Sequence, residues 1–102
     1  MSESVYMLTN PHPGETLLED FMKPLGLTAY RVAKDIGVPI TRIDQIIGGR
    51  RGISADTAIR LSAYFGTSAD VWLGLQAHYE LMEVRRSKKI DVKPYRALVK
   101  TG

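Results

Sequence analysis

The sequence predicts an all-α protein, with five short helices followed by a C-terminal tail. Apolar residues recur at spacings of three and four in five separate segments, which is the period of an amphipathic helix. Glycine or proline separates each segment from the next. No segment alternates apolar and polar residues for long enough to predict a sheet. At 102 residues, the chain has room for one domain with one core.

An arm and a first helix are predicted at the N-terminus. Residues 1–10 are expected to form a flexible arm. Pro13 suits the first turn of the helix that follows, because its missing N–H costs nothing there. Gly26 ends this helix. Its apolar stripe lies within residues 15–25 and consists of Leu17, Leu18, Phe21, Met22 and Leu25.

The second and third helices are predicted to be short and to lie on either side of a single glycine. Thr28 is a natural N-cap for a helix over residues 29–36, which Gly37 ends. Pro39 begins the third helix, which runs to about residue 47 and stops before two consecutive glycines. The apolar positions of these two helices are Val32, Ala33, Ile36, Ile40, Ile43, Ile46 and Ile47.

Two further helices and a tail complete the predicted fold. Ser54 caps the fourth helix, which Gly66 ends, and either Thr67 or Ser68 caps the fifth. The fourth helix is expected to bury Ala58, Ile59, Leu61, Ala63, Tyr64 and Phe65. The fifth carries an apolar stripe of Trp72, Leu75, Tyr79 and Met82. The domain is therefore expected to span residues 11–86. Residues 87–102 form a basic tail, either without regular structure or with a short strand over residues 90–92.

The composition is that of an ordinary globular domain, with 44% hydrophobic and 25% charged residues. The chain has no cysteine, which excludes disulfide bridges, thiolate chemistry and zinc sites built on cysteine. No stretch approaches the roughly 20 apolar residues that cross a bilayer. The N-terminus, which carries Glu3, lacks the basic start and apolar run of a signal peptide. These observations predict a cytoplasmic protein with no membrane association.

Charge alternates along the chain. Residues 28–53 carry five Lys or Arg against two Asp, a net charge of +3. The flanking segments are acidic: residues 1–27 have one basic and four acidic residues (−3), and residues 54–80 have one and three (−2). Residues 81–102 have seven basic and two acidic residues (+5). Like charges gathered in one short segment are what a phosphate-binding surface needs.

Residues 29–49 carry the pattern of a helix-turn-helix. Two helices that meet at a steep angle need a small residue where they touch, which Ala33 supplies, and a residue that tolerates positive φ at the turn, which is Gly37. Apolar anchors are present before, within and after the turn, namely Val32, Ile36, Val38, Ile43 and Ile46. The alternative is a plain helical hairpin in a bundle, with Gly37 as a helix cap. The basic charge of this segment favours the helix-turn-helix.

The third helix is predicted to enter the major groove of DNA with its N-terminal residues nearest the bases. Thr41, Arg42 and Gln45 can hydrogen-bond to base edges there. Ile40 either contacts a thymine methyl or packs against the protein, and Asp44 either trims the local charge or braces Arg42. Phosphate contacts are expected from two arginines, from N–H groups at two helix starts, and from one arginine on the outer face of the second helix. These residues are Arg50, Arg51, Thr28, Ala29, Ser54 and Arg31.

Several short motifs together resemble one known family. They are His12-Pro13-Gly14-Glu15, Gly37-Val38-Pro39, Gly49-Arg50-Arg51, Ile53-Ser54-Ala55-Asp56-Thr57-Ala58, Tyr64-Phe65-Gly66-Thr67-Ser68, Trp72-Leu73 and Leu75-Gln76. The chain resembles the HigA antitoxins, also called VapI-like proteins, within the Xre (lambda-repressor-like) helix-turn-helix group. The resemblance covers about residues 11–84 and leaves the tail unmatched.

The resemblance implies a five-helix lambda-repressor-like DNA-binding domain and two partners. One is double-stranded operator DNA, bound by a homodimer that represses its own toxin-antitoxin operon. The other is a HigB toxin, a RelE-like endonuclease that cuts mRNA and that the antitoxin neutralises in the cytoplasm. Carried onto this chain, the recognition helix covers residues 39–45.

Dimerisation also follows from the small reach of one recognition helix, which contacts only a few base pairs, so useful affinity needs two half-sites. The fifth helix offers Leu75, Tyr79 and Met82 for a dimer interface, and the alternative is that these residues complete the core. A ribonuclease toxin that binds ribosomal RNA would be basic, which favours acidic segments as its docking surface. The candidates are Glu15, Glu19 and Asp20.

Catalysis is not expected, because no nucleophile, base and stabilising group can be assembled. The two histidines, His12 and His78, lie in different segments, and neither a cofactor nor a metal is predicted. Two other functions remain open. One is a stand-alone Xre-family regulator without a toxin, and the other is a protein-interaction module whose helix-turn-helix has lost DNA binding.

Overall fold

The structure is a computed structural model that describes residues 10–96. Within that range every regular element is helical, and no strand occurs. The elements are α2 (Pro13–Thr16), η1 (Leu17–Met22), α3 (Ala29–Ile36), α4 (Ile40–Ile47), α5 (Ala55–Phe65) and α6 (Ala69–Ser87). Because η1 continues α2 without a break, these form five helices and confirm the predicted all-α fold. Residues 1–9 of the predicted arm and residues 97–102 of the predicted tail lie outside the described residues.

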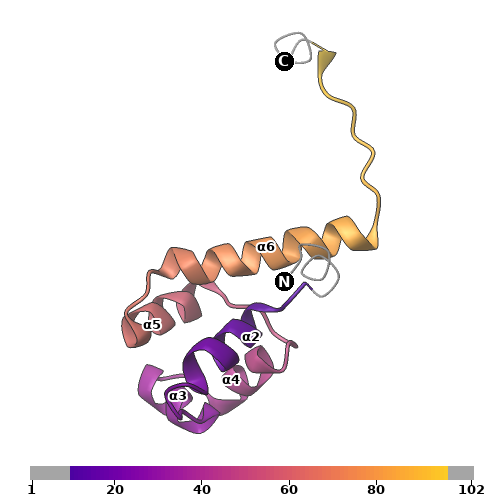
Figure 1. Cartoon of the computed structure of the whole chain (residues 1–102). Coiled ribbons are helices and arrows are strands. Elements are labelled where there is room, and N and C mark those ends of the chain that lie inside the picture. The colour runs from indigo at the N-terminus through magenta and orange to yellow at the C-terminus, as the bar shows by residue number, and fades with distance from the viewer. Residues whose placement is uncertain (1–9, 97–102) are drawn as a thin grey trace.

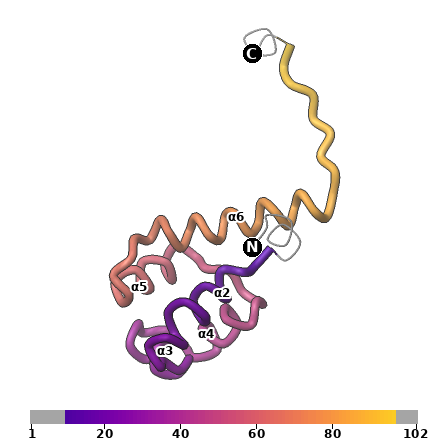
Figure 2. The backbone as a smooth tube through the Cα atoms, in the orientation of Figure 1, coloured from indigo at the N-terminus to yellow at the C-terminus, as the bar shows by residue number. Residues whose placement is uncertain are grey.

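The helices pack as two pairs around one core, α3 with α4 and α5 with α6. The two pairs are joined by the contact of α5 with α3 (Figure 1). α2 contacts one helix of each pair, α4 and α6. After Ser87 the chain runs away from this body without regular structure as far as residue 95 (Figure 2). Of the two alternatives left open for residues 90–92, a short strand or no regular structure, the structure therefore shows the second. No helix in the described part of the chain is long and apolar enough to cross a membrane.

Local capping rules place most of the helix ends. The Thr28 hydroxyl accepts a hydrogen bond from the Arg31 N–H at 3.1 Å, as an N-cap should. Ser54 and Ser68 each accept from the N–H three residues on, both at 3.3 Å. Ser68 is thus the cap of α6. The other predicted candidate, Thr67, accepts instead from the Trp72 indole N–H at 2.8 Å.

The first helix differs from the prediction in its second half. The Lys23 N–H donates to the carbonyl of Leu18, five residues earlier, at 2.9 Å, and the helical segment ends at Met22. A turn closed in this way holds more residues than the 3.6 of an α-helix, so later positions rotate off the predicted face. Leu25, predicted to be buried, is 63% exposed for this reason.

The core draws on every helix. Its buried apolar members are Leu17, Met22, Val32, Ala33, Ile36, Ile43, Ile46, Ile53, Ala58, Leu61 and Trp72. Two residues of α5 were wrongly predicted to be buried. Ile59 is 60% exposed and Ala63 is exposed, because the buried side of α5 follows Thr57, Ala58 and Leu61, and a residue two positions from Leu61 lies about 200° around the helix.

The first turn of α2 is packed against the end of α4. A Cβ on Gly14 would lie 1.8 Å from the carbonyl oxygen of Ile46, so no other residue fits without moving one helix. His12 caps this helix, because its Nδ1 accepts a hydrogen bond from the Gly14 N–H at 2.9 Å. Burial lowers the pKa of His12 below its ordinary value, and the nearby Glu15 only partly opposes the shift.

Candidate nucleic-acid interface

The turn between α3 and α4 has the geometry of a helix-turn-helix. Gly37 has a φ of 78°, in the left-handed region that favours glycine. The N–H groups of Gly37 and Val38 both donate to the carbonyl of Ala33, at 2.9 and 3.0 Å. The Ala33 side chain is buried, as the close approach of the two helices requires. The interpretation of residues 29–49 as a helix-turn-helix therefore agrees with the observed geometry.

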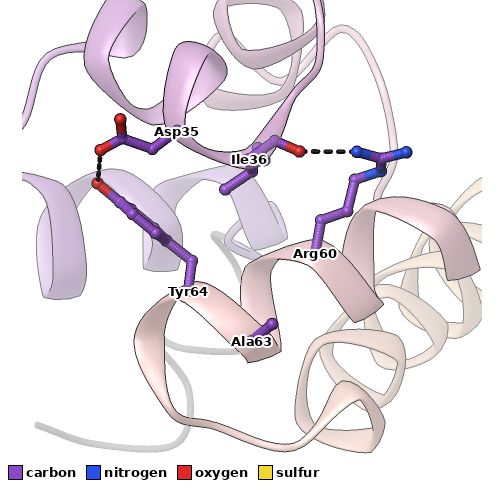
Figure 3. Close-up of a pocket in the computed structure, with 5 residues that line it drawn as sticks. All are labelled: Asp35, Ile36, Arg60, Ala63 and Tyr64. Carbon is purple, nitrogen blue, oxygen red and sulfur yellow. Dashed lines mark hydrogen bonds between the residues drawn. The ribbon is translucent and has the colours of Figure 1, made fainter.

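An arginine of α5 holds the end of α3. The Arg60 Nη1 donates to the carbonyl of Ile36 at 2.7 Å and to that of Gly37 at 3.4 Å. A cation at a helix C-terminus also interacts favourably with the helix dipole. Figure 3 shows this contact at one end of a pocket whose lining residues are Asp35, Ile36, Arg60, Ala63 and Tyr64. This role of Arg60 could not be predicted, because its partners are 23 and 24 residues away and leave no local pattern in the sequence.

A second contact joins the same two helices at the other end of the pocket. The Tyr64 hydroxyl donates to Asp35 at 2.6 Å (Figure 3), and the Arg31 Nε donates to the same carboxylate oxygen at 2.7 Å. These two donors, the tyrosine first, hold the pKa of Asp35 below its ordinary value. Arg31 is one of the predicted phosphate contacts, so in the unbound protein its guanidinium is already paired with Asp35.

The predicted recognition helix, α4, presents some of its expected residues to solvent. Thr41 is exposed and Ile40 is 41% exposed. Gln45 is partly buried, and its side-chain oxygen accepts a long hydrogen bond of 3.4 Å from Arg51. The fourth predicted residue, Arg42, is different. Its side chain is only 26% exposed, and its Nη1 lies 3.4 Å from the carboxylate of Asp56 in α5.

The basic loop that follows α4, residues 48–53, is held in place by a contact with α6. Arg50 and Arg51 are both exposed there. In the same loop, the Ile53 N–H donates to the side-chain oxygen of Gln76 at 2.9 Å. A Cβ on Gly52 would lie within 2.8 Å of the Gln76 amide, so the loop passes close to this side chain. From the sequence, Gln76 was given no role beyond its place in the Leu75-Gln76 motif. The one available signal was its position among the apolar residues of α6.

The remaining predicted phosphate contacts lie at helix starts. Thr28 and Ser54 are exposed, and Ala29 is partly buried. Both hydroxyls already accept a hydrogen bond from their own helix, so further contacts there would come from backbone N–H groups.

The three residues predicted for dimerisation are all partly buried within their own chain. Leu75 packs against the core, and the Tyr79 ring meets the ring of His12 edge-on, with centroids 4.8 Å apart. Met82 follows one turn later. Two apolar neighbours of Met82, Leu81 (47%) and Val84 (37%), are exposed. The acidic candidates for toxin binding, Glu15, Glu19 and Asp20, are exposed and line one shallow depression on the first helix.

Comparison with known proteins gives one family and several close relatives. Residues 18–72 match the helix-turn-helix family HTH_3. The chain is 46% identical to virulence-associated protein I of Dichelobacter nodosus over 78 residues. This alignment covers 76% of this chain and 72% of the D. nodosus protein. Antitoxin HigA of Pseudomonas aeruginosa, solved with the higBA promoter, is 40% identical with a TM-score of 0.70, over 71% of this chain and 78% of that one. A P. aeruginosa protein in complex with its operator DNA is 37% identical with a TM-score of 0.76, over 78% and 85% of the two chains.

Proposed function

The chain belongs to the HTH_3 helix-turn-helix family and is related to antitoxin HigA, and on that premise we propose that it is an operator-binding repressor and the antitoxin of a HigBA-type module. The family consists of DNA-binding proteins rather than enzymes. The observation that carries the proposal is the exposed start of α4, held at the Gly37 turn and followed by the two exposed arginines of the basic loop. The relatives solved on promoter and operator DNA support it.

In this proposal the first turns of α4 lie in the major groove. Thr41 and Gln45 hydrogen-bond to base edges, and Ile40 contacts a thymine methyl, because its 41% exposure leaves part of the side chain free of the protein. Arg42, the other residue predicted to contact bases, lies against Asp56 of α5 instead of pointing freely into solvent.

Phosphate contacts position this helix on the duplex. Arg50 and Arg51 supply them from the loop, where Gln76 holds the backbone in place. The helix starts at Thr28, Ala29 and Ser54 add backbone N–H groups. Arg31 joins them from α3, with its guanidinium shared between a phosphate and Asp35.

We propose that the protein binds its operator as a homodimer, because one short recognition helix spans too few base pairs for useful affinity. The dimer contact lies on α6. Met82 is at its border, and the exposed Leu81 and Val84 lie beside a groove that continues to Ile90. Apolar side chains exposed together along one helix are typical of an association surface.

The proposed protein partner is a RelE-like mRNA endonuclease that the chain neutralises in the cytoplasm. Similarity to antitoxin HigA supports this, and the exposed carboxylates of the first helix offer a surface of the right charge for a basic ribonuclease. The alternative is a stand-alone regulator. Co-purification with the product of the neighbouring reading frame, and loss of that protein's toxicity on co-expression, would favour the antitoxin. A neighbour that neither binds nor is toxic would favour the stand-alone regulator.

Selection of binding sites from random duplex DNA tests the DNA-binding part. The wild-type protein should enrich a palindromic site. Gln45→Ala should relax the preference at one position per half-site, at a cost of about 1–3 kcal/mol. Changing Arg50 and Arg51 together to Ala should weaken binding to all sequences and reduce the slope of log K against log salt by about 1 per lost contact.

The matched control changes Lys93 and Arg96 to Ala. This removes the same charge from the segment after α6, where both residues are exposed and lie outside the groove proposed for the dimer contact. It should leave the salt slope unchanged. An equal fall in slope for both pairs would show that net charge, rather than the basic loop, carries the binding. Failure of the wild-type protein to enrich any site would contradict the proposed function.

A further inference from the structure

Arg42 differs from the other residues predicted to contact bases in being held by the protein itself. Its Nε is a buried side-chain nitrogen with no hydrogen-bond partner among the described residues. Its Nη1 lies 3.4 Å from the Oδ2 of Asp56. A guanidinium that contacts guanine presents two free N–H groups to one base. Here one nitrogen is buried and another faces a carboxylate, so the side chain is not arranged for that contact.

Asp56 also holds a second arginine. The Arg60 Nε donates to the same Oδ2 at 2.9 Å, and the Nη1 of Arg60 donates to the carbonyl of Ile36 at 2.7 Å. One carboxylate oxygen therefore connects the recognition helix α4, through Arg42, to the turn at the end of α3, through Arg60. All three helices around the turn meet in this network.

The charges make Asp56 the centre of the network. Two guanidinium groups face one carboxylate, and without it they would repel each other across a short distance. Arg42 would be destabilised more than Arg60, because its side chain is only 26% exposed, whereas Arg60 is 41% exposed and keeps its hydrogen bond to the Ile36 carbonyl. Asp56 itself is stabilised in the first turn of α5, where the helix dipole favours a negative charge.

We propose that Asp56 is a positioning residue that sets the orientation of α4 relative to the turn, and that Arg42 acts through Asp56 rather than on a base. The proposal rests on the proposed DNA binding and deepens it. It leaves Ile40, Thr41 and Gln45 as the base-contacting residues of α4. The network then affects the affinity for the operator without changing the preference for any base pair.

The chain supplies a matched control for Asp56. Both α5 and α6 begin with Ser-Ala-Asp, and Asp70 occupies in α6 the position that Asp56 occupies in α5. Asp70 makes no ion pair among the described residues. Replacing either aspartate removes the same charge and the same contribution to a helix start. A second control, Asp44→Ala, removes a negative charge from α4 itself.

The experiment measures operator affinity and base preference for Asp56→Ala, Arg42→Ala, the double variant and the two controls. Asp56→Ala should lower operator affinity about tenfold, although it makes the protein more positive. The double variant should bind no more weakly than the weaker single variant, because both changes break one network. Base preference should be unchanged in all three. Asp44→Ala and Asp70→Ala should bind as well as the wild type or better.

Two results would overturn the proposal. If Arg42→Ala relaxed the preference at one base pair while Asp56→Ala changed neither preference nor affinity, Arg42 would be a base-contacting residue. If Asp56→Ala changed operator affinity as Asp44→Ala does, the effect would come from the lost negative charge alone and not from the contact of Asp56 with Arg42. Asp56→Asn, which keeps an oxygen acceptor and the size of the side chain, replaces Asp56→Ala should that variant fail to fold.

A readout without DNA separates this proposal from the proposed function. In NMR spectra of the free protein, the Nε–H of Arg42 should exchange slowly with water, and Asp56→Ala should make it exchange at the rate of an exposed arginine. Asp70→Ala should leave it unchanged. Fast exchange in the wild type, or no effect of Asp56→Ala, would contradict the positioning role even in a protein that binds its operator. A wild-type protein that binds no DNA would contradict the proposed function, whatever the exchange rate.

Discussion

The two halves of α6 lie in different surroundings. Trp72, in the first half, is fully buried, whereas Leu81 and Val84, in the second half, are exposed. No described residue after Trp72 is buried. We call residues 10–76 the packed region and residues 77–96 the distal region. The packed region contains the whole core, the helix-turn-helix and the basic loop.

The difference between the regions shows what a helical period can and cannot predict. The predicted apolar stripe of α6 is fully buried only at Trp72, and Leu75, Tyr79 and Met82 are partly buried. Leu81 and Val84, which lie beside the stripe, are exposed. Buried apolar area stabilises the fold, and exposed apolar area is available for association. A change in the packed region should therefore alter the free energy of unfolding, and a change in the distal region should alter the oligomeric state.

The largest effect should come from a single methyl group in the packed region. Gly14→Ala places a Cβ against the Ile46 carbonyl, so α2 and α4 must separate, at a cost of about 3 kcal/mol or more. Gly74→Ala is the matched control, because nothing lies within 4 Å of a Cβ on Gly74. There the same change should stabilise the helix by about 0.5–1 kcal/mol. Urea unfolding measures both, and equal effects would abolish the contrast between buried and open helix positions.

The next effect concerns association rather than folding. Replacing Leu81 and Val84 together by Ser should weaken a dimer about 10–100-fold while changing the free energy of unfolding of the monomer by less than about 0.5 kcal/mol. Sedimentation at several protein concentrations measures the dissociation constant of the dimer. Urea unfolding at protein concentrations below that constant measures the free energy of unfolding of the monomer. A variant that stays dimeric but unfolds easily would show that the distal region is part of the core.

The parts of the fold that depend on neighbouring residues were predictable. The bounds of α3 were predicted to the residue, because Thr28 caps one end and Gly37 adopts its left-handed conformation at the other. Ser54 and Gly66 bound α5 in the same way. At such positions one side chain and a few adjacent N–H groups decide the outcome.

The parts that depend on distant partners were not predictable. The wide turn that exposes Leu25 has no recognisable sequence signal. In the candidate site, the apolar anchors of the helix-turn-helix were predicted, but the contact of Arg42 with Asp56, 14 residues away, was not. Asp44, the nearer carboxylate, had been considered as a brace for Arg42. The contact with Asp56 arises only when α5 packs against α3, which brings the first turn of α5 to Arg42.

A third prediction concerns the link between α6 and the basic loop. Gln76→Ala leaves the Ile53 N–H without its acceptor and should lower the free energy of unfolding by about 1–2 kcal/mol. It should also weaken operator binding, since the loop carries Arg50 and Arg51. Glu80→Gln is the control, because it alters only the exposed contact on the other side of the Gln76 amide. If both variants unfolded alike, the buried hydrogen bond would contribute nothing.

A smaller effect should appear as a pH dependence at the seam between the two regions, where His12 meets Tyr79. Burial holds the pKa of His12 below its ordinary 6.5, so the unfolded chain takes up the proton more readily than the folded one. The stability that His12 contributes is complete above pH 6.5 and is lost as the pH falls from there through the folded pKa. Protonation also removes the Nδ1 acceptor that caps α2.

Unfolding measured between pH 7.5 and 5 tests this prediction with two variants. His12→Asn keeps an acceptor for the cap but does not titrate, so its stability should depend less on pH than that of the wild type. His78→Asn, on the exposed side of α6, should leave the wild-type slope unchanged. A slope that survives in His12→Asn would assign the pH dependence to other groups.

The smallest effect should come from the rim of the packed region, where Tyr64 joins α5 to α3. Tyr64→Phe removes the hydroxyl that donates to Asp35, which is the main cause of the lowered pKa of that carboxyl. The pKa of Asp35 should rise toward its ordinary value but not reach it, because Arg31 still donates to the same oxygen. A depressed carboxyl pKa stabilises the fold above the unfolded pKa and ceases to do so as the pH falls through the folded one. The variant should therefore be slightly less stable than the wild type at pH 7 and equal to it in strong acid.

NMR titration of Asp35 measures the shift of its pKa, and Tyr30→Phe, which changes an exposed tyrosine of α3, is the control. An unchanged Asp35 titration in Tyr64→Phe would mean that Arg31 alone lowers the pKa of the carboxyl. The side-chain hydrogen bonds of α5 to the end of α3 would then come from Arg60.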